Sequence, residues 1–371
     1  MKDSPLRVLQ IYPKQDYFTG AAIQLRELTR GLAARGHEVV IATRPSAEWA
    51  ERSRETGITH YALPMTSEVD LRSVRTLVRI LGKHDIQVVH AQKGKARTLA
   101  MIAGLFVRIP VLVLNRGVSF PVDPFTRLGY TTRRVAAIVA VCESIKRGLV
   151  ASGVDAAKIH VIYSGTDTDR FHPSVDGTGI RRELGLGPEH FLVTQIGVRS
   201  GKGNDDVIEA MARVAPRAPH ARLLVVGARR PERLLERARQ RGLEGRMSVW
   251  GYREDVPQIL RASDCCVDAS YAGLGLTGTL REALAVETAV IGTDIEGNPE
   301  LLVHGETGLL VPPRDPAALA AAMQRMLDEP RLRRETARAG RTLVEAKFSA
   351  RAKLDATEAL YRRLVAEKTR A

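Results

Sequence analysis

The sequence predicts an α/β protein made of two Rossmann-like domains in tandem. Short runs rich in Val and Ile alternate with amphipathic segments of helical period, a pattern typical of parallel βαβ units. The polar, turn-forming segment at 164–179 interrupts this alternation, which then starts again. The chain has 371 residues, 44% of them hydrophobic and 26% charged, which is enough for two domains with separate cores.

The first domain is predicted over residues 1–165. Its opening strand, LRVLQIY at 6–12, leads through a loop to a helix over 21–36 whose leucines recur with helical spacing. The further strand-like runs are short and almost wholly apolar, as expected of parallel strands with both faces buried. These runs lie at 39–43, 85–91, 111–114 and 136–141.

The second domain is predicted over residues 166–345. Its strands are predicted at 191–197, 223–227, 247–251, 265–270, 289–294 and 308–313. The pattern beyond Asp315 is helical, and the last segment, 346–371, is expected to pack back on the first domain. Two such domains place a cleft between the carboxyl edges of their sheets, where open α/β sheets bind ligands.

Positive charge is concentrated in the first half of the chain. Residues 1–160 carry 24 lysines and arginines against 13 aspartates and glutamates, and so hold +11 of the net charge of +14. This asymmetry indicates an anionic partner, such as an acidic membrane face or a phosphorylated ligand; the alternative is that these side chains only solvate the surface. A nucleic acid partner is not expected, because aromatic residues make up 5% and no basic run is interleaved with them.

The cysteine pattern indicates a reducing compartment. Cys142, Cys265 and Cys266 are odd in number and lack C-x-x-C spacing, so they suit no disulfide framework. The N-terminus lacks the apolar core of a signal peptide, and the longest apolar stretch is broken by Arg108 and Pro110. We therefore expect a cytoplasmic protein, with a peripheral position on the inner face of the cell membrane as the alternative.

Gly273, Gly275 and Gly278 have the spacing G-x-G-x-x-G between a predicted strand and a predicted helix. This spacing is typical of dinucleotide binding, and Asp294 stands near the position of a ribose-binding acid. In a dinucleotide fold, however, the fingerprint belongs to the first βα turn of its domain. Here three predicted strands of the second domain come before it, which argues against an NAD-dependent oxidoreductase.

Another glycine-containing loop, VRSGKG, does follow the first strand of the second domain. It carries Arg199 and Lys202, which could face the helix start at 275–279 and form a diphosphate clamp with backbone N–H groups. Glu282 falls on the first turn of that helix, where a carboxylate can accept both hydroxyls of a ribose. The plainer alternatives are a surface lysine and a glutamate that complements the helix dipole.

Together these segments resemble the family 4 retaining glycosyltransferases, which have the GT-B fold. The resemblance covers nearly the whole chain and rests on RGHEVVIAT, VHAQKGKA, VRSGKG and the blocks at 140–171 and 278–315. It implies transfer of a sugar from a nucleotide-diphosphate sugar, UDP- or GDP-linked, to an acceptor bound mainly by the first domain. It also implies that the reaction needs no cofactor, no metal and no protein nucleophile, because the leaving phosphate takes the acceptor proton.

Position by position, the resemblance assigns catalytic roles to Arg199 and Lys202. They would hold the donor diphosphate and stabilise its charge as the sugar leaves. Glu282 would bind the ribose of the donor. The other donor contacts would come from Thr277, Gly278 and Thr279 at the phosphates, Thr19 and Gly20 of the first domain, and Tyr252 and Arg253 at the base.

Two positions depart from the family pattern. Leu274 stands where the first glutamate of the E-x7-E motif normally contacts the transferred sugar, so we expect it to shape an unusual donor pocket. Arg116 stands before Gly117 where many members have histidine. It either binds an anionic acceptor or the donor phosphate, or forms a structural salt bridge.

Several weaker signals leave alternatives open. His90 ends a first-domain strand and Lys93 precedes the next helix; both could bind the acceptor, or be a buried histidine and a solvated lysine. Asp167 and Asp169 form a literal D-x-D, but their place at the domain connection argues against a metal site. The segment 96–108 could lie on a membrane surface or simply pack on the sheet.

The sequence therefore predicts a metal-independent retaining glycosyltransferase that builds a cell-surface polysaccharide, lipopolysaccharide or glycolipid. A phosphorylase or synthase acting on a soluble sugar phosphate is the alternative on the same fold. A catalytically weak or silent nucleotide-sugar-binding protein is the alternative outside enzymes, motivated by Leu274 and Arg116.

Overall fold

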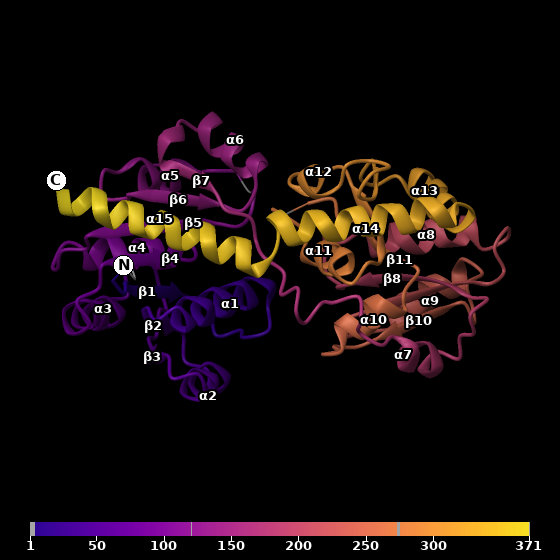
Figure 1. Ribbon diagram of the computed structural model, residues 1–371, viewed down its shortest axis with the longest axis horizontal. Coiled ribbons are helices and arrows are strands. Elements are labelled where there is room, and N and C mark those ends of the chain that lie inside the picture. The colour runs from indigo at the N-terminus through magenta and orange to yellow at the C-terminus, as the bar shows by residue number, and fades with distance from the viewer. Residues whose placement is uncertain (1–3, 120, 273–274, 371) are drawn as a thin grey trace. The chain divides into compact units, whose positions relative to one another are not determined.

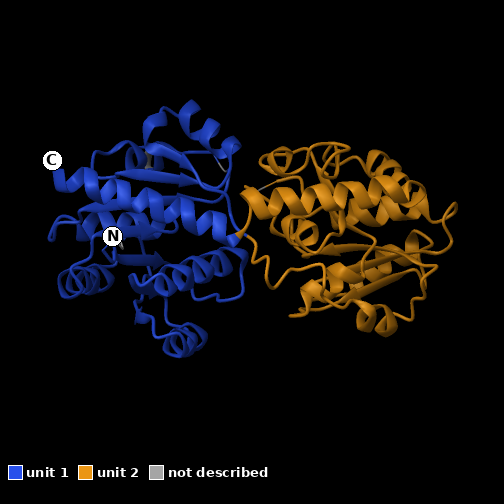
Figure 2. Ribbon diagram, in the orientation of Figure 1, with its two compact units in different colours: residues 1–165, 350–371 blue, residues 166–349 orange. Residues whose placement is uncertain are grey.

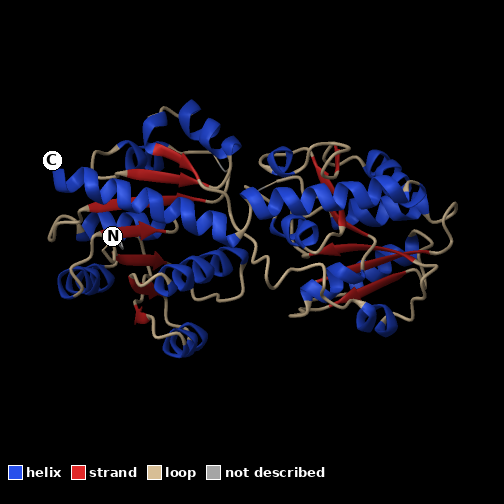
Figure 3. Ribbon diagram, in the orientation of Figure 1, coloured by secondary structure: helices blue, strands red, loops and turns tan. Residues whose placement is uncertain are grey.

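The computed structural model describes residues 4–119, 121–272 and 275–370 (Figure 1). The chain forms two compact units, Met1–Gly165 with Ala350–Ala371 and Thr166–Ser349 (Figure 2). Each unit contains one parallel sheet covered by helices on its faces (Figure 3). The predicted α/β class and the two sheets are therefore confirmed.

The sheet of the first unit has seven strands in the order β3-β2-β1-β4-β5-β6-β7. The strands are β1 (Arg7–Tyr12), β2 (Glu38–Thr43), β3 (Thr59–Ala62), β4 (Val88–Ala91), β5 (Val111–Arg116), β6 (Ala137–Ala140) and β7 (Ile159–Val161). The helices are α1 (Gly20–Ala34), α2 (Ala47–Glu55), α3 (Leu71–Lys83), α4 (Gly94–Ala103), α5 (Pro124–Thr131), α6 (Glu143–Ala151) and α15 (Ala350–Arg370), with a short 3-10 turn at Ala156–Lys158.

Alternation along the strands divides the first core between two faces. Val8 packs in a buried cluster with Leu32 of α1 and Tyr361 of α15. Its neighbour Leu9 belongs to the cluster on the opposite face, with Leu77 of α3. Because both faces are buried, the central strands read as continuous apolar runs, which is why the sequence revealed them.

The sheet of the second unit has six strands in the order β10-β9-β8-β11-β12-β13. The strands are β8 (Phe191–Ile196), β9 (Ala221–Val226), β10 (Met247–Trp250), β11 (Cys265–Asp268), β12 (Ala289–Thr293) and β13 (Leu309–Val311). The helices are α7 (Thr178–Glu183), α8 (Asn204–Val214), α9 (Glu232–Gln240), α10 (Val256–Ala262), α11 (Gly278–Ala285), α12 (Asn298–Leu301), α13 (Pro316–Asp328) and α14 (Pro330–Lys347).

Two details of the predicted organisation differ from the structure. The predicted boundary at 345 falls inside α14, and the chain enters the first unit again only at Ala350. The edge strands β3 and β7 were not predicted. Each is only three or four residues long and partly exposed, so neither shows the apolar run that marks the inner strands.

The C-terminal helix α15 is fixed to the first unit by a buried polar network. The Tyr361 hydroxyl accepts a hydrogen bond from Gln10 Nε2 at 3.1 Å and lies 2.6 Å from His90 Nδ1. Burial, helped by the charge of Lys353, lowers the pKa of His90 to about 3, so the ring is neutral and Nδ1 accepts the hydroxyl proton. At the rim, Arg35, the C-cap residue of α1, forms an ion pair with Glu358 at 2.6 Å.

Replacing Tyr361 by Phe should destabilise the first unit by about 1–3 kcal/mol, because Gln10 and His90 keep their buried polar groups but lose a partner. Urea unfolding followed by Trp49 fluorescence in a Trp250→Phe background would measure this, since Trp49 lies in the first unit. Tyr252→Phe is the control, because Tyr252 is 67% exposed. Equal unfolding midpoints for Tyr361→Phe and its parent would contradict the role of the network.

Candidate functional site

The candidate site lies where the strand order of the second sheet reverses. The strands β8 and β11 are neighbours, while the chain leaves β8 towards β9 on one side and β11 towards β12 on the other. Loops that follow the carboxyl ends of two such strands diverge and leave room for a ligand. Here they are the loop after β8, which carries Arg199 and Lys202, and the segment that leads from β11 to α11.

Glycines allow the loop after β8 to approach the neighbouring backbone. Gly197, Gly201 and Gly203 all have positive φ angles, between 64° and 98°. A Cβ atom at Gly203 would lie 2.1 Å from the carbonyl oxygen of Ala269, so only glycine fits there. Gln195 completes the loop by donating a hydrogen bond from Nε2 to the carbonyl of Lys202 at 2.9 Å.

The Lys202 side chain is buried and forms an ion pair with Asp268, the last residue of β11. Asp268 is 1% exposed, and its other oxygen accepts a hydrogen bond from the backbone N–H of Ser270 at 3.0 Å. The sequence analysis did not identify Asp268. The available signal was a carboxylate at the end of an otherwise apolar strand, CCVDAS, beside the reversal of strand order.

The sequence predicts Glu282 on the first turn of α11, but the structure places it four residues after Gly278, in the second turn. Its Oε1 is 3.9 Å from the position of a Cβ at Gly278, so the carboxylate lies over the start of the helix. Burial raises the pKa of Glu282, and the charges of Arg281, Arg170 and Lys202 oppose that rise. The charge of Lys202 is thus close enough to Glu282 to affect its pKa.

The start of α11 offers unpaired donors. Thr277 is the N-cap residue but its side chain makes no capping bond, so the first N–H groups of the helix have no side-chain acceptor. In the described part of the chain, the hydroxyls of Thr277 and Ser270 are buried without a hydrogen-bond partner. Thr279 lies in the same first turn and is partly exposed, while Leu274 and Gly273 lie outside the described residues.

Arg199 differs from Lys202 in being open to solvent. Its side chain is exposed and makes no hydrogen bond or ion pair with any residue that the structure describes. An exposed, uncommitted guanidinium beside a helix start can bind an anion.

The residues predicted to hold the base lie after the edge strand β10. Tyr252 is exposed. Arg253 is committed to protein carboxylates: its guanidinium binds Glu183 at 2.8 Å and Asp255 at 2.6 Å and stacks on Trp250. A guanidinium held in this way presents its face to Trp250 and has few donors left for a base.

The first-unit candidates occupy separate positions. Thr19 caps α1 by accepting from the backbone N–H of Ala22, and Gly20 begins that helix with open space around it. Lys93 precedes α4, as predicted, and is exposed. Arg116 ends β5 within 3.5 Å of the Tyr130 hydroxyl. His90 is 3% exposed beneath α15, which favours the alternative of a buried, hydrogen-bonded histidine over acceptor binding.

The D-x-D sequence forms a turn. One Asp167 oxygen accepts hydrogen bonds from the backbone N–H groups of Asp169 and Arg170, at 3.1 and 3.0 Å. Within the described ranges, no group of three or more metal-ligating side chains comes together. Among the described helices, none is both long and apolar enough to cross a membrane.

Two family models match the chain, and together they cover most of it. Glycosyltransferase Family 4 matches residues 18–170, and Glycosyl transferases group 1 matches residues 190–329. The chain belongs to the family 4 glycosyltransferases of group 1. The predicted family is thus confirmed, and the glycine spacing that suggested NAD belongs to a glycosyltransferase sequence.

Known members of the family are similar over different lengths. The lipopolysaccharide core biosynthesis mannosyltransferase LpsB of Rhizobium meliloti is 34% identical over 55% of this chain and 59% of its own length. The D-inositol 3-phosphate glycosyltransferase of Rhodococcus erythropolis is 34% identical over 48% of this chain and 42% of its own. The chain thus spans about half the length of these two relatives. The N-acetyl-alpha-D-glucosaminyl L-malate synthase of Bacillus anthracis is 25% identical over 92% of this chain and 93% of its own.

Solved glycosyltransferase structures share the fold. A glycosyltransferase from Rickettsia africae has a TM-score of 0.88 at 19% identity, covering 98% of this chain and 99% of that one. Anabaena HepE in complex with UDP has a TM-score of 0.85 at 19% identity, covering 96% of this chain and 100% of that one. At this identity the likeness concerns the fold, and it confirms the GT-B fold for this family 4 chain.

Removing one partner of the buried pair should destabilise the second unit. Lys202→Met or Asp268→Leu should each cost about 3–5 kcal/mol, because the remaining charge is buried without a partner. The double variant Lys202→Met with Asp268→Leu should recover most of this loss. Urea unfolding followed by Trp250 fluorescence in a Trp49→Phe background would measure the cycle. Additive losses in the double variant would show that the two side chains are not coupled.

Proposed function

We propose that this chain is a retaining glycosyltransferase that moves a sugar from a nucleoside-diphosphate sugar to a glycan or lipid-linked acceptor of the cell surface. The observation that carries the proposal is one juxtaposition at the reversal of strand order. Arg199 and Lys202 lie on the loop after β8, and the helix start that carries Glu282 follows the neighbouring strand β11. Cations and free N–H groups suit a diphosphate, and a carboxylate suits ribose hydroxyls.

The chemistry follows from the charge that develops when the sugar departs. Cleavage of the bond between the sugar and the diphosphate leaves negative charge on the phosphate oxygens. Arg199 and Lys202 would stabilise that charge in the transition state, and the N–H groups at the start of α11 would add their dipole. The acceptor oxygen would form its bond to the sugar on the face from which the phosphate leaves, and its proton would pass to the departing phosphate, so the protein supplies neither a nucleophile nor a base. Arg199 and Lys202 would supply the positive charge in place of a metal.

The names of similar proteins support the substrate class. HepE has been solved with UDP and with UDP-glucose, and LpsB is named a mannosyltransferase of lipopolysaccharide core biosynthesis. We propose a uridine or guanosine diphosphate sugar as donor and a lipopolysaccharide or related glycolipid as acceptor. Other similar proteins, such as the alpha-maltose-1-phosphate synthase of Mycolicibacterium smegmatis, support a soluble sugar phosphate as the second acceptor class.

One observation favours a weak or silent binding protein as a second candidate. The ion pair with Asp268 already neutralises Lys202. A donor diphosphate would have to compete with a buried carboxylate for this cation, which leaves Arg199 as the uncommitted one of the two. A protein of this kind would bind the nucleoside diphosphate without transferring or hydrolysing the sugar.

Arg199→Ala should weaken nucleoside diphosphate binding and lower kcat about 10²–10³-fold, because it removes charge stabilisation from the departing phosphate. This variant is the cleanest test, since no described contact of Arg199 is lost.

Glu282→Gln should weaken binding of UDP or GDP but leave binding of pyrophosphate unchanged, because pyrophosphate has no ribose. Calorimetry with UDP, GDP and pyrophosphate, together with a transfer assay, would measure both effects.

Arg217→Ala is the matched control, an exposed arginine beyond the end of α8. If Arg199→Ala binds the preferred nucleotide as well as this control does, the donor site is placed wrongly. The transfer assay should proceed unchanged in EDTA. A strict requirement for Mn²⁺ or Mg²⁺ would contradict the metal-independent mechanism.

A surface of the first unit supports peripheral membrane contact. Leu105 and Phe106, directly after α4, are 61% and 70% exposed. The exposed arginines Arg108 and Arg134 flank them, and Arg134 reaches the carbonyl of Met101 on α4 at 3.4 Å. Exposed apolar side chains among cations suit an anionic lipid surface, where a lipid-linked acceptor would lie.

Leu105→Ser with Phe106→Ser should reduce sedimentation with vesicles that contain anionic phosphatidylglycerol. The reason is that these apolar side chains would no longer enter the lipid interface. Val69→Ser with Leu71→Ser is the control, because these residues of the same unit are 64% and 73% exposed but lie elsewhere. This contact would be contradicted if Leu105→Ser with Phe106→Ser did not reduce sedimentation with the vesicles, or if high salt did not weaken it.

A further inference from the structure

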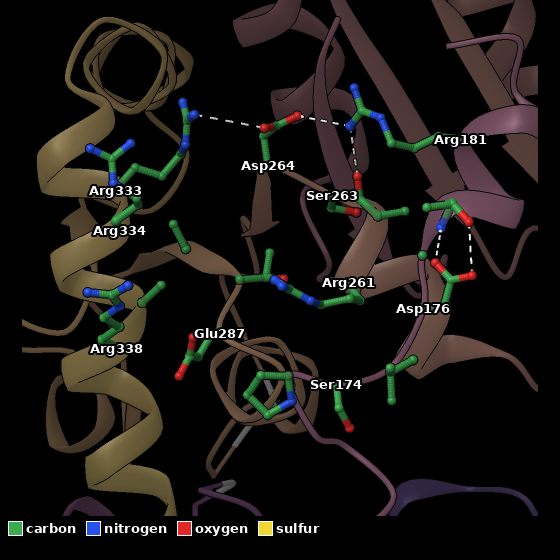
Figure 4. Close-up of a pocket in the computed structure, with 18 residues that line it drawn as sticks. Ser174, Asp176, Arg181, Arg261, Ser263, Asp264, Glu287, Arg333, Arg334 and Arg338 are labelled. Carbon is green, nitrogen blue, oxygen red and sulfur yellow. Dashed lines mark hydrogen bonds and ion pairs between the residues drawn. The ribbon is translucent and has the colours of Figure 1, made fainter. Parts of the chain in front are cut away.

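A cavity of about 660 Å³ opens on the second unit at the amino ends of β11 and β12 (Figure 4). Asp264, which precedes β11, and Ala289, which begins β12, both line it. The donor site proposed above lies at the carboxyl ends of the same parallel strands. The cavity is therefore at the opposite edge of the sheet and does not belong to that site.

Arginines dominate the lining of this cavity. Figure 4 shows Arg333, Arg334 and Arg338 along α14, while Arg181 of α7 and Arg261 of α10 come from the other wall. Among the residues that the structure describes, the guanidinium groups of Arg261, Arg334 and Arg338 have no hydrogen bond or ion pair. Three uncommitted guanidinium groups on two walls suit an anion better than a neutral ligand.

The carboxylates of the cavity do not cancel this charge. Asp264 is held by Arg181 at 3.3 Å and Arg333 at 3.9 Å, so those two arginines serve the fold. Asp176 accepts hydrogen bonds from the backbone and hydroxyl groups of Thr178, which lower its pKa. Glu287 is the third acid in the lining. The lining thus contains three arginines without a described partner and one carboxylate without a described partner, Glu287.

The backbone around the cavity is built for close approach. Gly177 in the wall leaves no room for a side chain, because a Cβ there would lie 2.5 Å from the backbone nitrogen of Ala262. Glu287 has φ of 56°, in the left-handed region that favours glycine. Glu287 is the residue after the C-cap of α11, and the hydrogen bonds from the backbone N–H groups of Glu287 and Thr288 to Leu284 and Ala283 close the helix there, so its carboxylate is held in the cavity wall by the end of the helix.

We propose that this cavity binds a phosphorylated sugar. The phosphate lies among Arg261, Arg334 and Arg338, and Glu287 accepts hydrogen bonds from the sugar hydroxyls. A cavity of this volume holds a ligand of that size. The fork-shaped guanidinium matches phosphate oxygens, whereas a carboxylate favours hydroxyl groups over a second anion.

Calorimetry with the full chain and two probes tests the proposal, at constant ionic strength. Glucose 6-phosphate has both the phosphate and the hydroxyls, and inorganic pyrophosphate has only phosphate. Arg334→Gln with Arg338→Gln should weaken glucose 6-phosphate binding about tenfold or more, because charge-assisted hydrogen bonds are lost. Glu287→Gln should weaken glucose 6-phosphate binding but strengthen pyrophosphate binding, because it removes a negative charge as well as a hydroxyl acceptor.

Matched variants separate this site from surface charge and from the donor site. Arg325→Gln with Arg331→Gln removes two exposed arginines of the same unit that lie outside the cavity, and should leave binding unchanged. Arg199→Ala should also leave glucose 6-phosphate binding unchanged. The proposal is overturned if the parent chain does not bind glucose 6-phosphate, if the control pair weakens binding as much as the cavity pair, or if Arg199→Ala alone abolishes it.

Discussion

Parallel strands cannot be joined by tight turns. Each connection instead runs through a helix on one face of the sheet, which brings the chain back to the edge where the next strand begins. In both sheets this rule collects the loops that follow the strands at the carboxyl edge. It also forces one place where the chain changes direction, between β1 and β4 in the first unit and between β8 and β11 in the second. Arg199 and Lys202 are separated from Glu282 by about 80 positions in the sequence. They come together because their loops both follow strands at the carboxyl edge, where the strand order reverses.

Burial gives the donor site its electrostatic character. Lys202 and Asp268 are both buried, and each supplies the opposite charge that compensates the burial of the other. Glu282 has no ion-pair partner among the residues that the structure describes, and burial raises its pKa against the field of three cations. The site therefore holds one buried ion pair, one desolvated carboxylate, Glu282, and one solvent-facing cation, Arg199. An arriving diphosphate has most to gain from Arg199 and from the free N–H groups of α11.

The sequence was informative where burial imposes a pattern. Inner strands such as β8 and β11 were predicted because both of their faces are buried, whereas the short, partly exposed edge strands β3 and β7 leave no such trace. The donor loop and Glu282 were predictable from their positions after strands and at a helix start. Asp268 could not be predicted, because a single acidic residue at the end of a strand forms no recognisable motif with other residues. The ion pairs of Arg253 were also hidden, because Glu183 is 70 positions away.

One helix links the two edges of the second sheet. The start of α11 at Gly278 lies at the edge of the proposed donor site, with Glu282 one turn further along, and its last residue, Ala285, lies two positions before Glu287 in the arginine cavity. The cavity wall is fastened to this helix. Gly340 of α14 packs so closely on Leu284 that a Cβ there would lie 2.3 Å from a methyl carbon, and buried Arg341 of α14 donates to the carbonyl of Ala285. A close-packed contact of this kind cannot slide freely. The α14 wall of the cavity and α11, whose start belongs to the proposed donor site, are therefore packed as one rigid part of the second unit.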